Sequence, residues 1–153
     1  MNTRPNGNNM LKSLLCFCLL LILMLQTSCG GVGDWSYDLP NNYQILRVNS
    51  NSVVFGKYED LFERKLDRYI VSFCFNDCYI GLERIPLDDI PPDQQIDIKK
   101  FDRTNSEYYL MDSANDLLYG PYSKDDYNEQ CNDLGINDMC EWIETIIKPE
   151  GAY

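Results

Sequence analysis

The chain has 153 residues, with 24 acidic and 13 basic side chains, seven cysteines and no histidine, and its formal net charge is −11. This length suits one domain with a leader and excludes a large multidomain enzyme. The acidic balance argues against a nucleic-acid partner, because binding phosphates requires clustered Lys and Arg. The lack of histidine excludes imidazole bases, imidazole metal ligands and Ser–His or Cys–His triads.

Residues 1–28 have the three zones of a secretory signal peptide. Arg4 and Lys12 precede an unbroken apolar run over 14–25, and small residues follow it. Twelve helical residues span only ~18 Å, whereas the bilayer hydrocarbon is ~30 Å thick. The pattern therefore favours export over a permanent membrane span, with an uncleaved N-terminal anchor as the alternative.

The segment LQTSC at 25–29 resembles the lipobox of bacterial lipoproteins, in which the cysteine is lipidated and becomes the new N-terminus. Ser28 and Gly30 on either side of Cys29 fit this pattern, whereas Gln26 stands where an aliphatic residue is usual. The resemblance implies that Cys29 is lipidated and attaches the exported domain to a membrane. The alternative is an ordinary signal-peptidase cut near Ser28 that leaves Cys29 as a free thiol.

Cleavage before Cys29 would leave 24 acidic and 11 basic side chains, a net charge of −13. Such a body is repelled by anionic lipid, so acyl chains at ~0.8 kcal/mol per buried CH₂ would have to hold it. The predicted organisation is a signal peptide over 1–28, the lipidated cysteine with a short Gly-rich tether over 29–34, and one globular domain over 35–153. The four tether residues 30–33 reach at most ~14 Å, which keeps the domain close to the bilayer.

The sequence of the first half of the domain predicts short strands separated by turn residues. Strands are predicted over 43–48 and 53–58, and the charged stretch 59–67 is either a hairpin excursion or one helical turn.

A hairpin is predicted over 68–85. A two-residue turn at its centre would pair Phe73 with Ile80 and make one face entirely apolar, whereas a three-residue loop would pair Cys74 with Cys78. Because a one-residue slip exchanges the faces, the hydrophobic pattern favours the first register. That register disfavours a bridge between Cys74 and Cys78.

Residues 86–107 hold three of the seven prolines and little periodicity. A loop of this length is a floppy polar insertion or a functional segment, and together with Tyr108 and Tyr109 it is the predicted contact surface. A second hairpin is predicted over 108–112 and 117–120.

Helical signals dominate the C-terminal part. Ser123 is placed to cap a helix over about 124–134 that Gly135 ends. A second helix is predicted from Asn137 to just before Pro149, and its apolar stripe consists of Met139, Trp142, Ile143, Ile146 and Ile147. The predicted fold class is α+β, with an antiparallel, meander-like β-sheet of about five to seven short strands followed by two C-terminal helices.

Four cysteines remain in the predicted domain: Cys74, Cys78, Cys131 and Cys140. An even number in an exported protein suggests two disulfides, and Cys131 and Cys140 could meet across the connection between the two predicted helices. Four independent thiols are the alternative. The spacings match structural zinc sites poorly.

The acidic residues leave carboxylate chemistry open. A glycosidase needs two carboxyl groups ~5–10 Å apart across a cleft, which the sequence does not reveal, and a solvated acidic surface is the simpler reading. The segment 112–116 is similar to a calcium loop, but Ala114 and Leu117 stand where a ligand and a glycine are needed. The sequence holds no phosphate loop or dinucleotide fingerprint, and no cofactor is expected.

Three stretches cover much of the predicted domain: GDWSYDLPNNYQILRVNS at 33–50, FCFNDCYIGLER at 73–84 and YYLMDSANDLLYGPYSKDDYNEQCNDLGI at 108–136. They resemble a family of small bacterial lipoproteins of unknown function. The resemblance implies one exported domain at the cell envelope, and because the family carries no assigned catalytic residues it implies no activity.

These observations predict an exported, lipid-anchored protein of the cell envelope that acts as a non-catalytic binding or structural module. The expected partners are the membrane, through the N-terminal lipid, and another envelope protein. Two alternatives stay open: a carboxylate-dependent hydrolase of glycans or cell-wall polymers, and an acidic inhibitor or immunity-type protein that neutralises a basic partner.

Overall fold

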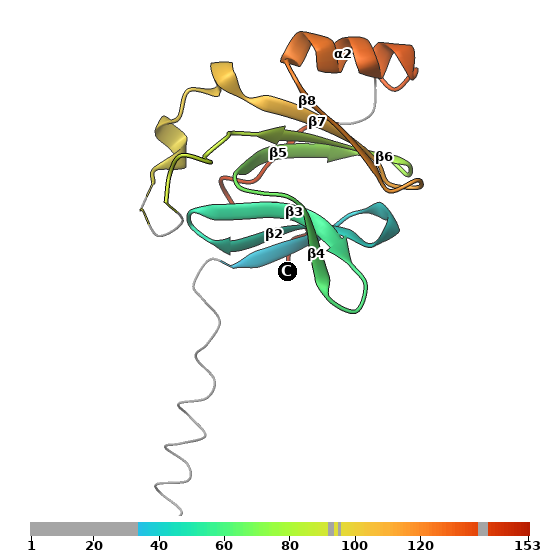
Figure 1. Ribbon diagram of the computed structural model, residues 1–153. Coiled ribbons are helices and arrows are strands. Elements are labelled where there is room, and N and C mark those ends of the chain that lie inside the picture. Colours follow the sequence, from blue (N-terminus) through green and yellow to red (C-terminus); the bar gives the residue numbers. More distant parts are fainter. Residues whose placement is uncertain (1–33, 92–93, 95, 138–140) are drawn as a thin grey trace, which may run out of the picture. The chain divides into compact units, whose positions relative to one another are not determined.

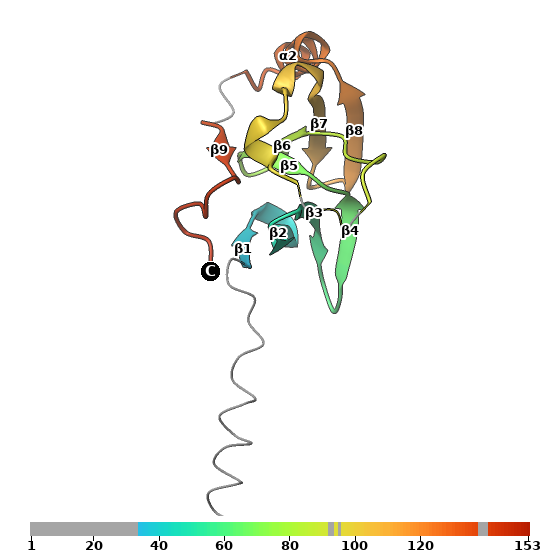
Figure 2. The ribbon, with the colours of Figure 1, turned by 90° about the vertical axis from the view of Figure 1, so that its left-hand side faces the viewer.

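A computed structural model describes residues 34–91, 94, 96–137 and 141–153, which lie within one compact unit, Gly33–Tyr153. They form two antiparallel sheets and a single α-helix (Figures 1 and 2). The first sheet contains, in spatial order, β1 (Trp35–Asp38), β2 (Tyr43–Asn49), β3 (Ser52–Tyr58) and β4 (Phe62–Leu66). The second contains β8 (Leu117–Tyr122), β7 (Glu107–Asp112), β6 (Tyr79–Arg84), β5 (Ile70–Phe75) and β9 (Ile143–Glu144).

The remaining elements are the helix α2 (Lys124–Asp133) and the short 3₁₀ helices η1 (Pro40–Asn42), η2 (Ile98–Lys100) and η3 (Arg103–Asn105). Figure 1 shows α2 above the second sheet, and the first sheet below the second.

Alternation along the strands gives the second sheet two different faces. In β7, Tyr109 and Met111 point into the core between the sheets, whereas Tyr108 and Leu110 pack with α2. The inter-sheet core also contains the fully buried residues Tyr43, Ile45, Phe55, Phe73, Ile80 and Leu82. Because apolar residues occupy both faces of β7, this strand is covered on both sides.

The predicted α+β fold with two C-terminal helices is wrong, because the described residues form nine strands in two sheets and one α-helix. Three of these nine strands were not predicted: β1, β4 within the charged stretch 59–67, and β9 within the segment predicted as a second helix.

The segment predicted as a second helix pairs with a sheet instead. Ile143 and Glu144 form β9 at the free edge of β5, and both the amide and the hydroxyl of Thr145 donate to β5 carbonyls. Apolar residues do recur at helical spacing in this segment, but Ile147, the last residue of the predicted apolar stripe, is 68% exposed and therefore is not part of the core. Backbone pairing with an open strand edge has outweighed a short amphipathic pattern, since short isolated helices gain little by themselves. Met139 and Cys140 lie outside the described residues.

Other local predictions are confirmed. The strands over 43–48 and 53–58 form, and the hairpin of β7 and β8 turns at the predicted residues 113–116. Ser123 caps α2, its hydroxyl accepting a hydrogen bond from the amide of Asp126 at 3.2 Å, and Gly135 follows the helix with φ +70°.

The hairpin of β5 and β6 has the predicted faces in a different register. Phe75 pairs with Ile80 and Phe73 with Leu82, two residues away from the predicted alignment. The connection is longer because the side-chain oxygen of Asn76 accepts hydrogen bonds from the amides of Cys78 and Tyr79. A shift by two residues preserves the faces, which is why the hydrophobic pattern could not exclude it.

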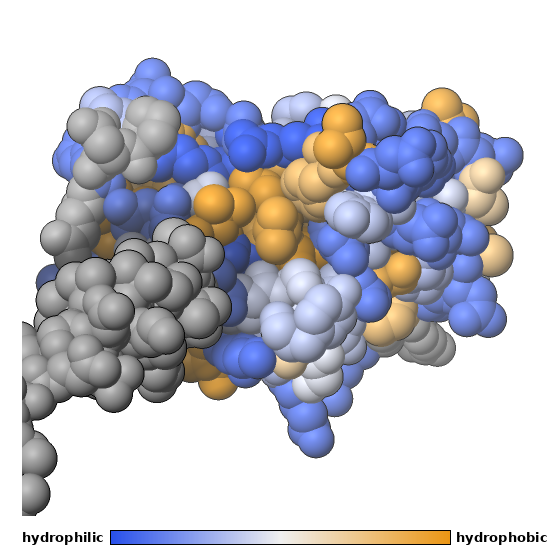
Figure 3. Space-filling view, turned by 90° about the horizontal axis from the view of Figure 1, so that it is seen from below, coloured by the Kyte–Doolittle hydropathy of each residue, from blue (hydrophilic) through white to orange (hydrophobic). Residues whose placement is uncertain are grey.

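The outer side of the first sheet is a mixed surface. Figure 3 shows a group of apolar side chains near the centre of the face seen from below, surrounded by polar ones. Among the described residues of this sheet and its turns, Val48 and Leu61 are exposed apolar side chains. No helix in the described ranges is long and apolar enough to cross a membrane.

Candidate functional site

A cavity of about 680 Å³ lies on the outer face of the second sheet. The helix α2 contacts β7 and β8, and β9 extends the opposite edge beside β5, so the middle of this face stays open between them. Side chains from β5, β6, β7, η3, α2 and the β9 segment line it. The principal ones are Ser72, Glu83, Tyr108, Arg103, Lys124, Tyr127, Asn128, Trp142 and Glu144. Its volume is within the range of small-molecule binding sites.

An ion pair with a buried carboxylate forms part of the cavity lining. Glu83 is 7% exposed and receives two hydrogen bonds from Arg103, from Nε to Oε1 at 3.0 Å and from Nη2 to Oε2 at 2.6 Å. The hydroxyl of Ser72 donates a third, at 2.7 Å. Burial would raise the pKa of Glu83, but these donors outweigh it and the pKa lies below its ordinary value. The carboxylate is therefore ionised at neutral pH, with its oxygens engaged.

Arg103 also reaches across to the β9 segment. Its Nη1 lies 3.0 Å from Oε1 of Glu144, so one guanidinium joins β6 to β9. Lys124, at the start of α2, supplies the second cation of the lining. The carboxylates of Glu83 and Glu144 balance the charges of Arg103 and Lys124. The formal charge of this part of the cavity is therefore zero, whereas the net charge of the chain is −11.

Three aromatic rings form a wall of the cavity. The ring centroids of Tyr108 and Tyr127 are 5.6 Å apart, and Trp142 lies 6.2 Å from the first and 5.9 Å from the second. Tyr108 and Tyr127 are 9% and 5% exposed, whereas Trp142 is 37% exposed. The two tyrosines thus support Trp142 from behind, and Trp142 presents the accessible aromatic surface.

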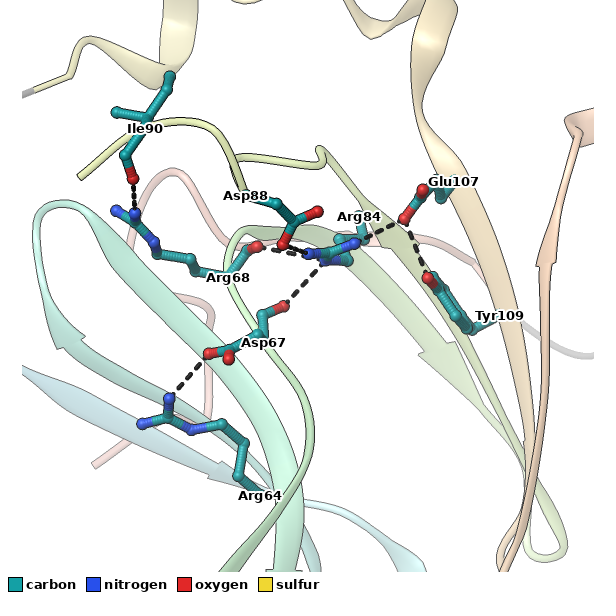
Figure 4. Close-up of polar contacts among 8 residues, drawn as sticks. All are labelled: Arg64, Asp67, Arg68, Arg84, Asp88, Ile90, Glu107 and Tyr109. Atoms are coloured by element: carbon teal, nitrogen blue, oxygen red, sulfur yellow. Dashed lines mark hydrogen bonds and ion pairs between the residues drawn. The ribbon is translucent and has the colours of Figure 1, made fainter. Parts of the chain in front are cut away.

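A second cavity, of about 550 Å³, lies beside the connection between the two sheets. Five of its lining residues, Arg64, Asp67, Arg68, Asp88 and Ile90, belong to a network of polar contacts that Figure 4 shows together with Arg84, Glu107 and Tyr109.

Arg84 organises these contacts. Its guanidinium donates to Asp88 at 2.6 Å, to Glu107 at 2.7 Å and to the backbone carbonyls of Asp67 and Arg68 at 3.2 Å each. Tyr109 donates to the same Glu107 at 2.9 Å. Because these contacts tie the β4–β5 connection to β6 and β7 and engage all three nitrogens of the guanidinium, this network fits a structural role.

The two tyrosines predicted as a contact surface lie on opposite faces of β7. Tyr108 is part of the cavity wall, whereas Tyr109 points into the inter-sheet core and donates to Glu107. The described part of the 86–107 segment is held against the domain by buried Leu87 and Ile98 and by Arg103. Only Tyr108 of the predicted pair reaches the candidate site.

The predicted thiols are distributed over several environments. Cys74 and Cys131 are buried and line one cavity of about 180 Å³ with Tyr127, and burial raises the pKa of the Cys131 thiol. Cys78 is exposed in the β5–β6 connection. Cys29 and Cys140 lie outside the described residues, so lipidation and a Cys131–Cys140 bridge both stay predictions.

The described part of the chain gives no support to the zinc and calcium alternatives. In it, no group of three or more His, Cys, Asp or Glu side chains could hold a metal ion. In the segment similar to a calcium loop, the carboxylate of Asp112 accepts hydrogen bonds from Ala114 and Asn115, and that of Asp116 accepts from Tyr43 and Lys65. These carboxylates shape a hairpin turn and join it to the first sheet.

Sequence reasoning missed Glu83, Arg103 and Trp142. The available signal was the polar residues within the mostly apolar strands β5 and β6, Ser72 in the first and Glu83 and Arg84 in the second. A buried polar residue needs a partner, so this pattern could have indicated a polar site, but not that Arg103 supplies it.

We expect the Glu83–Arg103 pair to make stability depend on acidic pH. Since the folded pKa of Glu83 is below its ordinary value of 4.5, the unfolded state binds more protons in this window. The contribution is full above the unfolded pKa and is lost as the pH falls through the folded pKa. Urea unfolding from neutral pH to about pH 3 should give a shallower pH dependence for Glu83→Gln than for the wild type.

Glu150→Gln, which changes an exposed carboxylate outside the cavity, is the matched control and should keep the wild-type slope. Parallel curves for Glu83→Gln and the wild type would contradict the assignment.

Comparison with known proteins places the chain in a family. A family model described as "Protein of unknown function (DUF3997)" matches residues 40–145, well over half of the 153 residues. No curated protein and no solved structure matches the chain. The match confirms that the chain belongs to an uncharacterised family, as expected. The matched residues include most of the strands and all residues of the first cavity. That the protein is a lipoprotein stays a prediction. The chain belongs to the DUF3997 family of proteins of unknown function.

Proposed function

We propose that the protein is an exported, lipid-anchored component of the cell envelope whose domain binds a ligand rather than catalysing a reaction. One observation supports binding above all: the buried carboxylate in the large cavity is held by three hydrogen bonds. A general acid at neutral pH needs a raised pKa, and the pKa of Glu83 is lowered. The cavity therefore offers fixed polar groups and an aromatic surface for recognition.

Anchoring is supported by the sequence before the domain. The leader over 1–28, Cys29 and the Gly-rich tether fit a lipoprotein, and β1 begins only six residues after Cys29. A tether of this length holds the domain within ~20 Å of the membrane. The cavity would then be accessible to ligands that belong to the envelope or are confined to it.

The anchor is tested by the mass of the intact protein. When the full chain is expressed in a bacterium, the membrane-extracted protein should begin at Cys29 and carry the added mass of acyl chains. Cys29→Ser should abolish that added mass, because serine has no thiol to be lipidated. Cys78→Ser, at the exposed thiol of the domain, is the matched control and should keep it.

Other masses would overturn the anchor in distinguishable ways. A wild-type chain without lipid that begins at or after Cys29 would be a secreted protein. A chain that retains residues 1–28 would be held by an uncleaved leader. Alkylation without reduction in the same measurement counts the free thiols of the domain.

A further inference from the structure

The exposed tryptophan of the cavity identifies the part of the site most suited to a ligand. Trp142 is 37% exposed, whereas the other tryptophan of the chain, Trp35, is 4% exposed in the core. Full burial of a large apolar side chain is worth ~1.5–3 kcal/mol, and Trp142 leaves part of this gain unused. An indole surface that is open within a cavity is available to stack against a ligand.

The contacts and the burial of the three rings decide which kind of ligand this surface accepts. A cation held by aromatic rings must lie within ~6 Å of each ring centroid and between the rings. Here the three rings are only 5.6 to 6.2 Å from one another, which is the separation of rings in direct contact. Tyr108 and Tyr127 are only 9% and 5% exposed, so Trp142 alone offers an open aromatic platform and the three rings do not form a cage.

The charges of the lining argue against an anionic ligand. Arg103 is shared between Glu83 and Glu144, which leaves Lys124 as the one cation of the lining without an ion pair among the described residues. Phosphate or nucleotide recognition generally uses several converging cations or a run of backbone amides. Instead, the lining also contains the uncharged polar side chains of Thr104 and Asn128, whereas the hydroxyl of Ser123 is used in the cap of α2.

We propose that this cavity binds a neutral saccharide, with a sugar ring stacked on Trp142. A pyranose ring has an apolar face of C–H groups, which suits an aromatic platform, and a rim of hydroxyls that both donate and accept hydrogen bonds. The fixed carboxylate of Glu144, the amide of Asn128 and the ammonium of Lys124 supply matching acceptors and donors. The proposal deepens the binding role proposed above and rests on it.

The test is a titration of the full-length protein in detergent with a neutral oligomer of N-acetylglucosamine. Trp142 should give a saturable change in tryptophan fluorescence, and Trp142→Phe should lose it because the remaining Trp35 is in the core. Calorimetry provides a readout that does not need the indole. There, Trp142→Ala should bind at least about tenfold more weakly, equivalent to ~1.4 kcal/mol.

Tyr119→Phe is the matched control, because Tyr119 is exposed on β8 and does not line the cavity. It should bind the oligomer as the wild type does, and circular dichroism should show that every variant is folded. If the folded wild type shows no saturable binding up to about 10 mM saccharide, the ligand class is wrong. Equal affinity of Trp142→Ala and the wild type would overturn the platform.

These failures are separate from failure of the lipid anchor, which the intact mass reports independently. Capture of a protein through Trp142 without saccharide binding would likewise overturn the saccharide proposal, while leaving the domain a binding module.

Discussion

Replacing Arg103 with alanine should lower the free energy of unfolding by about 3 kcal/mol. The reason is the partner left behind: Glu83 is 7% exposed, and without Arg103 it becomes a buried carboxylate that keeps only weaker donors. Loss of one member of a buried pair costs ~3–5 kcal/mol, and the 38% exposure of the Arg103 side chain places the expected loss at the lower end. Urea unfolding at neutral pH measures it.

Two comparisons make this expectation specific. Lys100→Ala removes a cation from the same segment, but its ion pair with Asp97 is on the surface, so the expected loss is below about 0.5 kcal/mol. The double variant Arg103→Ala with Glu83→Leu removes both charges and should recover most of the lost stability. If Arg103→Ala were no more destabilising than Lys100→Ala, the pair would not be a significant part of the fold.

Local sequence signals predicted the elements whose geometry is set by nearby residues. The cap at Ser123, the stop at Gly135 and the four-residue turn between β7 and β8 depend on contacts within a few positions. Each was predicted correctly because the required side chains lie in the same short stretch of sequence.

The elements missed depend on partners far along the chain. Ile143 and Glu144 became a strand because the edge of β5, some seventy residues earlier, was open to pairing. The Glu83–Arg103 pair likewise joins β6 to a segment that the sequence presented only as a proline-containing loop. The hydrophobic periodicity of a segment indicates which secondary structure the segment prefers by itself. It carries no information about which strand edge or carboxylate the segment contacts in the folded protein.

The candidate site was predictable only in part for the same reason. Tyr108 was identified because tyrosines are common in recognition surfaces, but Tyr109 beside it points into the core, as alternation along a strand requires. Trp142 was assigned to a helical stripe, and its place against Tyr108 and Tyr127 follows only from the way the chain returns over the second sheet.

The second large effect is expected at Tyr127, which attaches α2 to the sheet. Tyr127 is 5% exposed and contacts Tyr108 and Trp142 as well as packing with Leu110. Truncation of a buried aromatic residue to alanine costs ~3–5 kcal/mol through lost transfer free energy and the cavity left behind. Tyr127→Ala should therefore lower the free energy of unfolding by about 3 kcal/mol in urea titrations.

Tyr127→Phe separates packing from the hydroxyl group. Burial raises the pKa of Tyr127, and its hydroxyl lies near the thiols of Cys131 and Cys74, which are weak partners. Removing the hydroxyl should change stability by less than about 1 kcal/mol. Because Tyr127 supports the indole, Tyr127→Ala should also shift the fluorescence of Trp142 towards that of a solvated indole, whereas Tyr127→Phe should not. An unchanged spectrum in folded Tyr127→Ala would mean that Trp142 holds its position without support from α2, and the aromatic wall would then depend on Tyr108 alone.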